Sequence, residues 1–176
     1  FADESGRFEG RVSLENNGGF ASFRRGAQLP DLSAFDGLRL TVLGDGQVYK
    51  LNLRTDGAWD GVGWQAPFAT RDGVWETIDL TFDDLVPSWR GRLVSDAGIF
   101  DRSSIRELGV VLADKQQGPF RIDLKAIDAW RAPGSPSDSD LAARRDRTVG
   151  LAAMIDEGTS AQQIAEAMQW SERLIV

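Results

Sequence analysis

The sequence predicts an all-β domain over residues 1–130, followed by a linker and a short helical tail. Three observations lead to this fold class. Asp-Gly pairs recur along the chain, and Asp-Gly readily takes the positive φ angles that tight turns require. The segments between these pairs are short and alternate apolar with polar residues, and no helical pattern separates them. Such spacing indicates a sandwich or a barrel.

The alternation identifies the core-facing side of each expected strand. In Val48–Arg54, the side chains of Tyr49, Leu51 and Leu53 face one way and the polar side chains face the other. The apolar run Leu108–Ala113 is typical of a central strand, whereas 82–100 is expected to be a long connection. About eight strands follow from this pattern, at residues 7–14, 19–24, 38–43, 47–55, 62–68, 74–80, 105–113 and 119–130.

A linker and a helical tail complete the expected organisation. Residues 131–139 are rich in proline, glycine and serine and have no periodicity, as in a linker. Residues 140–176 have helical spacing, and Gly158 is a natural helix stop. This pattern predicts that the tail forms a helical hairpin or a unit similar to a helix-turn-helix. Residues 131–176 hold five Arg against seven Asp and Glu, a balance that disfavours DNA binding and makes a transcription factor the least favoured alternative.

Composition excludes several function classes. The chain has no His and no Cys, so it lacks an imidazole base, a thiolate nucleophile, disulfides and the usual zinc ligands. The net charge of −7 disfavours broad phosphate contact with nucleic acid. No apolar run approaches the roughly 18 residues of a membrane span. Because Phe1 is not a natural start, we expect an upstream segment that includes an N-terminal strand.

Three motifs together resemble one family. They are SLENNGGFASFR at Ser13–Arg24, VPSWRGR at Val86–Arg92 and LADKQQGPF at Leu112–Phe120. In this order they are similar to the complex I intermediate-associated protein family, over about residues 8–130. The resemblance implies a galactose-binding-like, jelly-roll β-sandwich. The family usually has a Trp-containing strand and a DGVMGG-like loop upstream of these motifs, which this sequence does not contain, and the tail lies outside the resemblance.

The resemblance also implies a function. The eukaryotic member of the family is a mitochondrial assembly factor for the respiratory NADH dehydrogenase. We therefore expect a non-enzymatic, chaperone-like module that binds a protein partner, either subunits or assembly intermediates of that complex. The expected location is the cytoplasm if the source is bacterial and the mitochondrial matrix if it is eukaryotic. No cofactor and no metal are expected, although an oxygen-ligated Ca²⁺ stays open as an alternative.

Polar residues on loops and on one strand face form the predicted binding surface. An arginine suits a carboxylate on a partner, and Trp and Arg dominate protein interfaces. The expected partner- or ligand-binding residues are Asn17, Arg24, Asn52, Arg54, Gln65, Trp89, Arg90, Asp114, Lys115 and Gln116.

Each of these groups also has a structural interpretation. Asn16–Gly19 can be a hairpin turn on which Phe20 and Phe23 pack, and Asp114–Gln116 a turn before the last strand. The arginines can pair internally with acids such as Asp84, Asp114 or Asp123, and Trp89 can anchor its loop. Asp83 and Asp84 are expected to cap a turn before Leu85.

The alternative function is a carbohydrate-binding module that uses the concave face of a sheet. Such a site needs an exposed aromatic ring beside Asn52, Arg54 or Gln65. Trp59, Trp89 and Tyr49 are the candidates for that ring, whereas Trp64, Trp75 and Trp130 are expected in the core. Fold alone cannot decide between the two functions.

Overall fold

A computed structural model describes residues 5–26, 29–58 and 60–135, and for Asn17 it describes the backbone only. The chain divides into two units, Phe1–Pro133 and Gly134–Val176. The first unit holds all the strands described below. The predicted helical tail, together with residues 136–139 of the predicted linker, lies outside the described residues, so the domain boundaries stay a prediction. No helix of the described part is long and apolar enough to cross a membrane.

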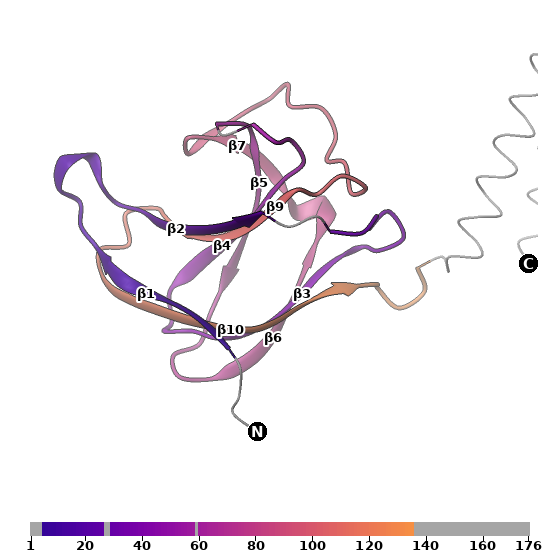
Figure 1. The fold of residues 1–176 in the computed structure, drawn as a ribbon. Helices are drawn as coiled ribbons and strands as arrows, with labels where there is room; N and C mark the ends of the chain where they lie inside the picture. The colour runs from indigo at the N-terminus through magenta and orange to yellow at the C-terminus, as the bar shows by residue number, and fades with distance from the viewer. Residues whose placement is uncertain (1–4, 27–28, 59, 136–176) are drawn as a thin grey trace, which may run out of the picture. The chain divides into compact units, whose positions relative to one another are not determined.

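The first unit is a jelly-roll β-sandwich of two antiparallel sheets (Figure 1). The four-stranded sheet has the order β1 (Gly6–Val12), β10 (Gly118–Trp130), β3 (Gly37–Leu43) and β6 (Trp75–Thr81). The six-stranded sheet has the order β2 (Ala21–Gly26), β9 (Glu107–Leu112), β4 (Val48–Arg54), β5 (Gly63–Ala69), β7 (Val86–Trp89) and β8 (Arg92–Leu93). Two short 3₁₀ turns, η1 (Glu15–Asn17) and η2 (Phe82–Asp84), lie in the connections.

The core lies between the sheets and follows the predicted alternation. Tyr49, Leu51 and Leu53 of β4 are buried, and they face Leu40 and Val42 of the four-stranded sheet's β3 within one apolar cluster. Burying a large apolar side chain stabilises the fold by about 1.5–3 kcal/mol relative to leaving it exposed. The alternation in β4 therefore fixes which side of this strand faces the core. Its other side is left to carry polar groups.

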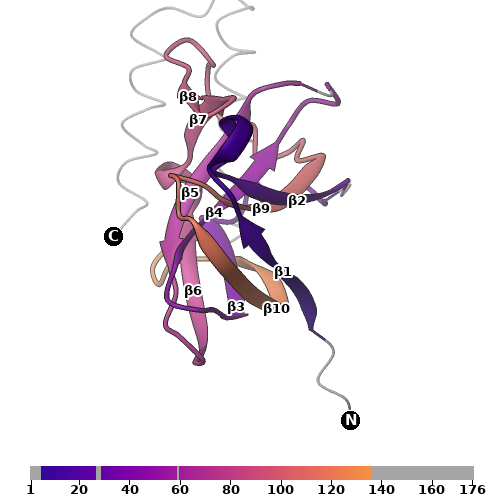
Figure 2. The same ribbon diagram turned by 90° about the vertical axis from the view of Figure 1, so that its left-hand side faces the viewer.

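Aromatic rings close both ends of this core. Phe8 of β1 contacts Phe23 of β2 and Phe120 of β10, with ring centroids 5.1 and 4.8 Å apart. Phe100 contacts Trp64 and Phe82, with ring centroids 5.4 and 5.5 Å apart. The contact between Phe8 and Phe23 joins the edge strands of the two sheets. Figure 2 shows these strands, β1 and β2, lying toward the same side of the sandwich.

The structure corrects three expectations about connections. Residues 82–100 are not only a connection, because they contain the β7–β8 hairpin, with the pair Trp89↔Arg92 and the two-residue turn Arg90-Gly91. Asn16–Gly19 is not a hairpin turn. It joins β1 of one sheet to β2 of the other, and a hairpin must join neighbours of one sheet. Asp83 and Asp84 were expected to cap the turn before Leu85, but they lie within it, and Thr81 is its N-cap: the Thr81 hydroxyl accepts from the Asp84 backbone N–H and donates to the Asp84 carboxylate.

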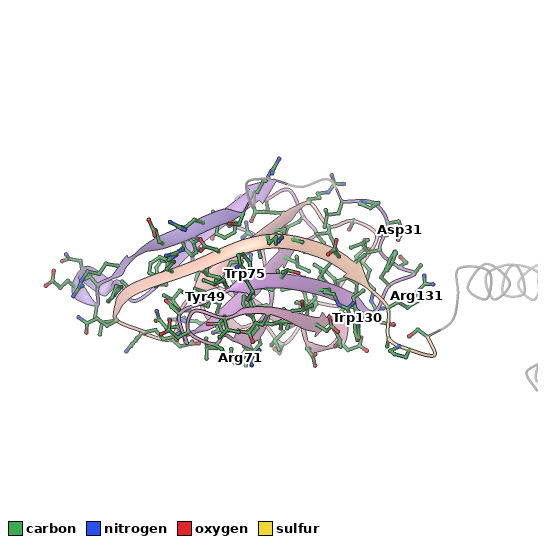
Figure 3. The ribbon with its side chains drawn as sticks, turned by 90° about the horizontal axis from the view of Figure 1, so that it is seen from below. Asp31, Tyr49, Arg71, Trp75, Trp130 and Arg131 are labelled. Carbon is green, nitrogen blue, oxygen red and sulfur yellow. The ribbon has the colours of Figure 1, made fainter. Side chains whose placement is uncertain are left out.

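Two aromatic residues also lie elsewhere than expected. Trp75 was expected in the core but is 39% exposed, because it starts β6 on the outer face of the four-stranded sheet; Figure 3 views the molecule from below and labels it. Phe20 was expected to pack beside the turn but is 66% exposed. Trp64 is buried as expected, Trp130 is partly buried, and Trp59 lies outside the described residues.

Candidate functional site

The outer face of the six-stranded sheet brings most of the predicted residues onto one strip along β4. Alternation turns Lys50, Asn52 and Arg54 away from the buried Tyr49, Leu51 and Leu53. Strand register then adds neighbours on both sides of this strip. Asn52 lies opposite Gln65 of β5 and opposite Gly109 of β9, and Gly109 lies opposite Arg24 of β2. A row of residues thus crosses four strands, from Arg24 to Gln65.

Two glycines make this row possible. A Cβ atom at Gly63 would collide with the side-chain oxygen of Asn52, and one at Gly109 would lie 3.1 Å from Cγ of Arg24. Both positions therefore leave room for a neighbouring side chain to lie flat on the sheet. Nε2 of Gln65 donates to Oδ1 of Asn52 at 3.1 Å, so the two amides lie together on the sheet.

Arg54 ties the β4–β5 loop to the sheet. Its guanidinium donates to the backbone oxygen of Ala58 at 3.1 Å and to that of Gly61, and its Nε lies 3.8 Å from Oε1 of Glu107. The side chain is 9% exposed. Within the fold, Arg54 therefore fixes the loop that carries Asp60, and it contributes positive charge below the surface rather than at it.

Arg24 shares the same carboxylate. Its Nη1 lies 3.5 Å from Oε1 of Glu107, and a third of its side chain is exposed. Sequence reasoning expected Asp84, Asp114 or Asp123 as internal partners of the arginines, but Arg24 and Arg54 meet at Glu107. Two guanidinium groups thus share the Glu107 carboxylate, and Arg24 is the more exposed of the two.

The β7–β8 hairpin forms one end of the strip. Arg90 has φ 49° and Gly91 has φ 76°, as the two turn residues of a type I′ hairpin do. The Arg90 guanidinium pairs with both carboxylate oxygens of Asp60, at 3.3 and 2.6 Å, and it lies 4.8 Å from the centre of the Trp89 ring. Nε1 of Trp89 donates to the backbone oxygen of Asp60 at 3.0 Å.

These contacts present Trp89 and Arg90 in a fixed arrangement. Hydrogen bonding from Arg90 is the main cause that lowers the pKa of Asp60, and the same bond raises the pKa of Arg90. Both side chains still reach solvent, with Trp89 39% exposed. A left-handed backbone at a non-glycine residue costs about 1–2 kcal/mol. The hairpin thus combines a left-handed non-glycine residue with an exposed aromatic ring.

Apolar side chains accompany the hairpin. Leu93 lies opposite Ser88, and Ser88 lies opposite Gly63, so Leu93 shares the outer face of the sheet with Asn52. Leu93 is 79% exposed, and Ile99 in the following loop is 95% exposed. A tryptophan, an arginine and bare aliphatic side chains thus occur together within one segment of the chain.

The turn at Asp114–Gln116 lies at the other end of the strip. Asp114 and Lys115 have φ 59° and 58°, and the Asp114 carboxylate pairs with Nζ of Lys50 at 2.8 Å. Gln116 is built into the fold. Its amide accepts from the Val48 N–H at 3.0 Å and donates to the Val48 oxygen at 2.7 Å, as a neighbouring strand would.

The η1 loop lies next to Lys115, because a Cβ atom at Gly19 would lie 3.5 Å from Cγ of Lys115. The side chain of Asn17 lies outside the described part. Strand register therefore places Arg24, Asn52 and Gln65 together on the outer face of the sheet, between the turn that carries Lys115 and the β7–β8 hairpin. Within that hairpin, alternation turns Trp89 to the face opposite Ser88 and Leu93.

Sequence reasoning missed several members of this surface. Asp60 and Glu107 hold the arginines, while Leu93 and Ile99 supply the exposed apolar groups. One signal was available, because Val86–Leu93 places a glycine turn between two short extended runs. No local signal pairs Glu107 with Arg24, which is 83 residues away along the chain.

The described residues assemble no cluster of acids that could hold a metal ion, and Asp83 and Asp84 do not act as a pair. There, no group of three or more Asp and Glu side chains gathers in a way that could hold a metal ion. Asp83 pairs with Arg102 at 2.8 Å, while Asp84 bonds to Thr81, so the two adjacent carboxylates face different partners.

The fold resembles a solved carbohydrate-binding module. The family 11 module of a cellulosomal cellulase from Clostridium thermocellum superposes with a TM-score of 0.51 and 16% identity, over 73% of this chain and 83% of that one. At this identity the likeness supports the jelly-roll architecture and carries no function.

Sequence comparison gives the family. The mitochondrial complex I intermediate-associated protein 30 of Neurospora crassa is 25% identical over 138 residues, 69% of this chain and 50% of that protein. The mouse (Mus musculus) protein of the same name is 29% identical over 107 residues, 58% of this chain and 33% of that protein. The chain thus spans half or less of the length of these relatives. The model of the complex I intermediate-associated protein 30 (CIA30) family matches residues 1–124, and the chain belongs to this family.

Proposed function

We propose that this chain is a non-enzymatic binding module that holds a protein partner during assembly of the respiratory NADH dehydrogenase, complex I. Family membership supports the process, because the matching relatives are named for intermediates of that complex. A eukaryotic source would place the module in the mitochondrial matrix, and a bacterial source in the cytoplasm. In either case the partner would be a subunit or a partly assembled intermediate.

The observation that carries the proposal is the β7–β8 hairpin. Trp89 and Arg90 are held by Asp60 yet remain exposed, and Leu93, on the other face of the same hairpin, is 79% exposed. Preorganised aromatic and arginine side chains lose little conformational entropy when a partner binds, which favours tight association. The strip along β4, from Lys115 past Asn52 and Gln65, would supply the polar rim of the same interface.

The alternative carbohydrate function lacks support on this face. It needs an exposed ring beside Asn52, Arg54 or Gln65. In the described residues, the rings of Tyr49 and Trp64 on the neighbouring positions are buried in the core. The Arg90 guanidinium lies over one face of the Trp89 ring, and Trp59, the remaining candidate ring, lies outside the described residues.

Affinity capture from detergent-solubilised membranes of the source cells tests the proposal. The intact protein should enrich subunits of the NADH dehydrogenase, identified by mass spectrometry. A Trp89→Ala, Arg90→Ala variant should lose at least about tenfold of that enrichment, since interface residues of these types often contribute 2 kcal/mol or more, by the usual ~1.4 kcal/mol per tenfold change in affinity.

The chain offers a matched control on its opposite sheet. Trp75 is exposed to the same extent as Trp89, and Arg71 pairs with Glu76 at 2.9 Å much as Arg90 pairs with Asp60. A Trp75→Ala, Arg71→Ala variant should therefore capture like the intact protein. Equal capture by all three proteins would reject the hairpin as the binding surface. Enrichment of no complex I subunit, with positive binding on a glycan array, would support the carbohydrate alternative instead.

A further inference from the structure

The β2 strand leaves one long edge of the six-stranded sheet open. It pairs with β9 from Ala21↔Leu112 to Gly26↔Glu107 without a shift in register. Along its other side, the described residues contribute no strand. Alternate N–H and C=O groups of such a strand point away from the sheet and can pair with another extended chain. β2 therefore presents a ready hydrogen-bonding template.

This edge is protected by charge alone. Proteins block sheet edges with proline, bulges, very short strands or charged side chains. β2 has six residues, ASFRRG, with no proline and no bulge, whereas the opposite edge of the same sheet, β8, has only two residues. Its charged side chains are Arg24, on the outer face, and Arg25, on the core-facing side with Phe23 at the exposed end of the strand. Such charges disfavour pairing with most strands but not with an acidic one.

The charge on this side of the molecule is opposite to that of the whole chain. β1 and β2 together carry four arginines and one glutamate, whereas the chain has a net charge of −7. The two strands lie beside each other, joined by the contact of Phe8 with Phe23 (Figure 2). Within the described residues, neither Arg11 nor Arg25 takes part in any ion pair. The edge is therefore basic and only partly neutralised.

This charge decides what can occupy the edge. A second copy of the chain, pairing β2 with β2 about a two-fold axis, would bring Arg24 and Arg25 of each copy close to those of the other. Like charges across neighbouring strands destabilise pairing. An acidic strand would instead meet Arg24 on one face and Arg25 on the other, because successive side chains of β2 alternate between the faces.

We propose that the free edge of β2 accepts an extended, acidic segment of a partner protein by β-strand addition. Backbone hydrogen bonds would supply part of the affinity whatever the sequence, and Arg24 and Arg25 would select for Asp or Glu. Phe20, which is 66% exposed directly before β2, would cover an apolar residue at one end of that segment. This inference does not rest on the proposed function, because it uses backbone groups at the edge of the sheet opposite the hairpin.

Fluorescence anisotropy with labelled peptides on the full 176-residue chain tests the proposal. The probes are an extended valine peptide with two adjacent glutamates at its centre, one for each face of the strand, and the same peptide with two lysines in their place. The acidic peptide should bind and the basic one should not. Arg24→Glu, Arg25→Glu should weaken binding at least about tenfold, since inverting two charges replaces attraction with repulsion. Arg92→Glu at the other edge of the sheet inverts an exposed arginine as well and should have little effect.

Backbone methylation separates strand addition from simple charge attraction, and it leaves the protein unchanged. N-methyl groups on one alternate set of peptide amides would block pairing with β2, whereas the same groups on the other set would point to solvent. Strand addition predicts that one methylated acidic peptide binds and the other does not. Equal binding of both would overturn the proposal, as would equal binding of the acidic peptide to the unchanged chain and to the Arg24, Arg25 variant. The Trp89→Ala, Arg90→Ala variant should bind the acidic peptide like the unchanged chain, even where it no longer captures complex I subunits.

Discussion

Tyr49 illustrates how one residue joins the core to the surface. Its ring is fully buried on β4, and its hydroxyl donates to the Asp45 carboxylate at 3.1 Å. The same carboxylate accepts from the backbone N–H of Arg121 at 2.8 Å and from Nε2 of Gln47 at 2.7 Å. Burial is the main cause that raises the pKa of Tyr49, and the charge of Asp45 raises it further. The phenol therefore stays protonated as long as the sandwich is folded.

This shift predicts an alkaline limit to stability. Because the folded-state pKa lies above the unfolded value of about 10, the unfolded chain loses its phenolic proton first as the pH rises. The stability associated with Tyr49 is thus complete below about pH 10 and decreases above it. The chain has a single tyrosine, so phenolate absorbance reports on this group alone. We expect absorbance to rise only together with loss of the β-sheet circular dichroism signal. A reversible phenolate titration near pH 10 with an intact sheet signal would contradict the assignment.

Individual burial patterns were predictable, and ion pairs were not. The alternation in Val48–Arg54 gave the right face for Tyr49, Leu51 and Leu53, because side-chain direction in a strand is a local property. The partners of Arg24 and Arg90 depend on strand register and loop shape. Glu107 and Asp60 are 83 and 30 residues away along the chain, so no local pattern identifies them.

At the scale of elements, the β7–β8 hairpin was the main omission. Its turn is Arg90-Gly91, and type I′ turns are usually recognised by Asn-Gly or Asp-Gly. Arg90 adopts the left-handed conformation because its side chain is held by Asp60 and by the Trp89 ring. These contacts of Arg90 allow a turn without the Asn-Gly or Asp-Gly pair that would identify it in a sequence. The same contacts hold the side chains of Trp89 and Arg90 in a fixed arrangement.

Substitutions at Arg90 test this explanation of the turn. Arg90→Gly and Arg90→Ala both remove the pair with Asp60, but only glycine takes φ 49° without strain. We expect Arg90→Gly to be more stable than Arg90→Ala by about 1 kcal/mol in urea unfolding. Arg92, two residues on, has no positive φ, and there the glycine variant should be the less stable of the two. The same order of stability at both positions would show that the left-handed turn is not what distinguishes Arg90.

At the scale of the whole molecule, the fold class and the membership of most strands followed from turn signals and alternation. The order of the strands in two sheets did not, because pairs such as β1 with β10 join distant parts of the chain. Resemblance to a family supplied the jelly-roll architecture. The candidate binding residues were chosen from polar and aromatic side chains on loops and on one strand face, and strand register places Asn52, Gln65 and Gly109 side by side.

The most direct test of the central claim is site-specific photo-cross-linking in source-cell membranes. A benzophenone side chain in place of Leu93 lies on the proposed surface, and one in place of Thr77 lies on the exposed outer face of the other sheet. We expect the probe at position 93 to cross-link a subunit of the respiratory NADH dehydrogenase and the probe at position 77 not to do so. Cross-links to such a subunit from position 77 alone, or equally from both positions, would contradict the hairpin as the partner-binding surface.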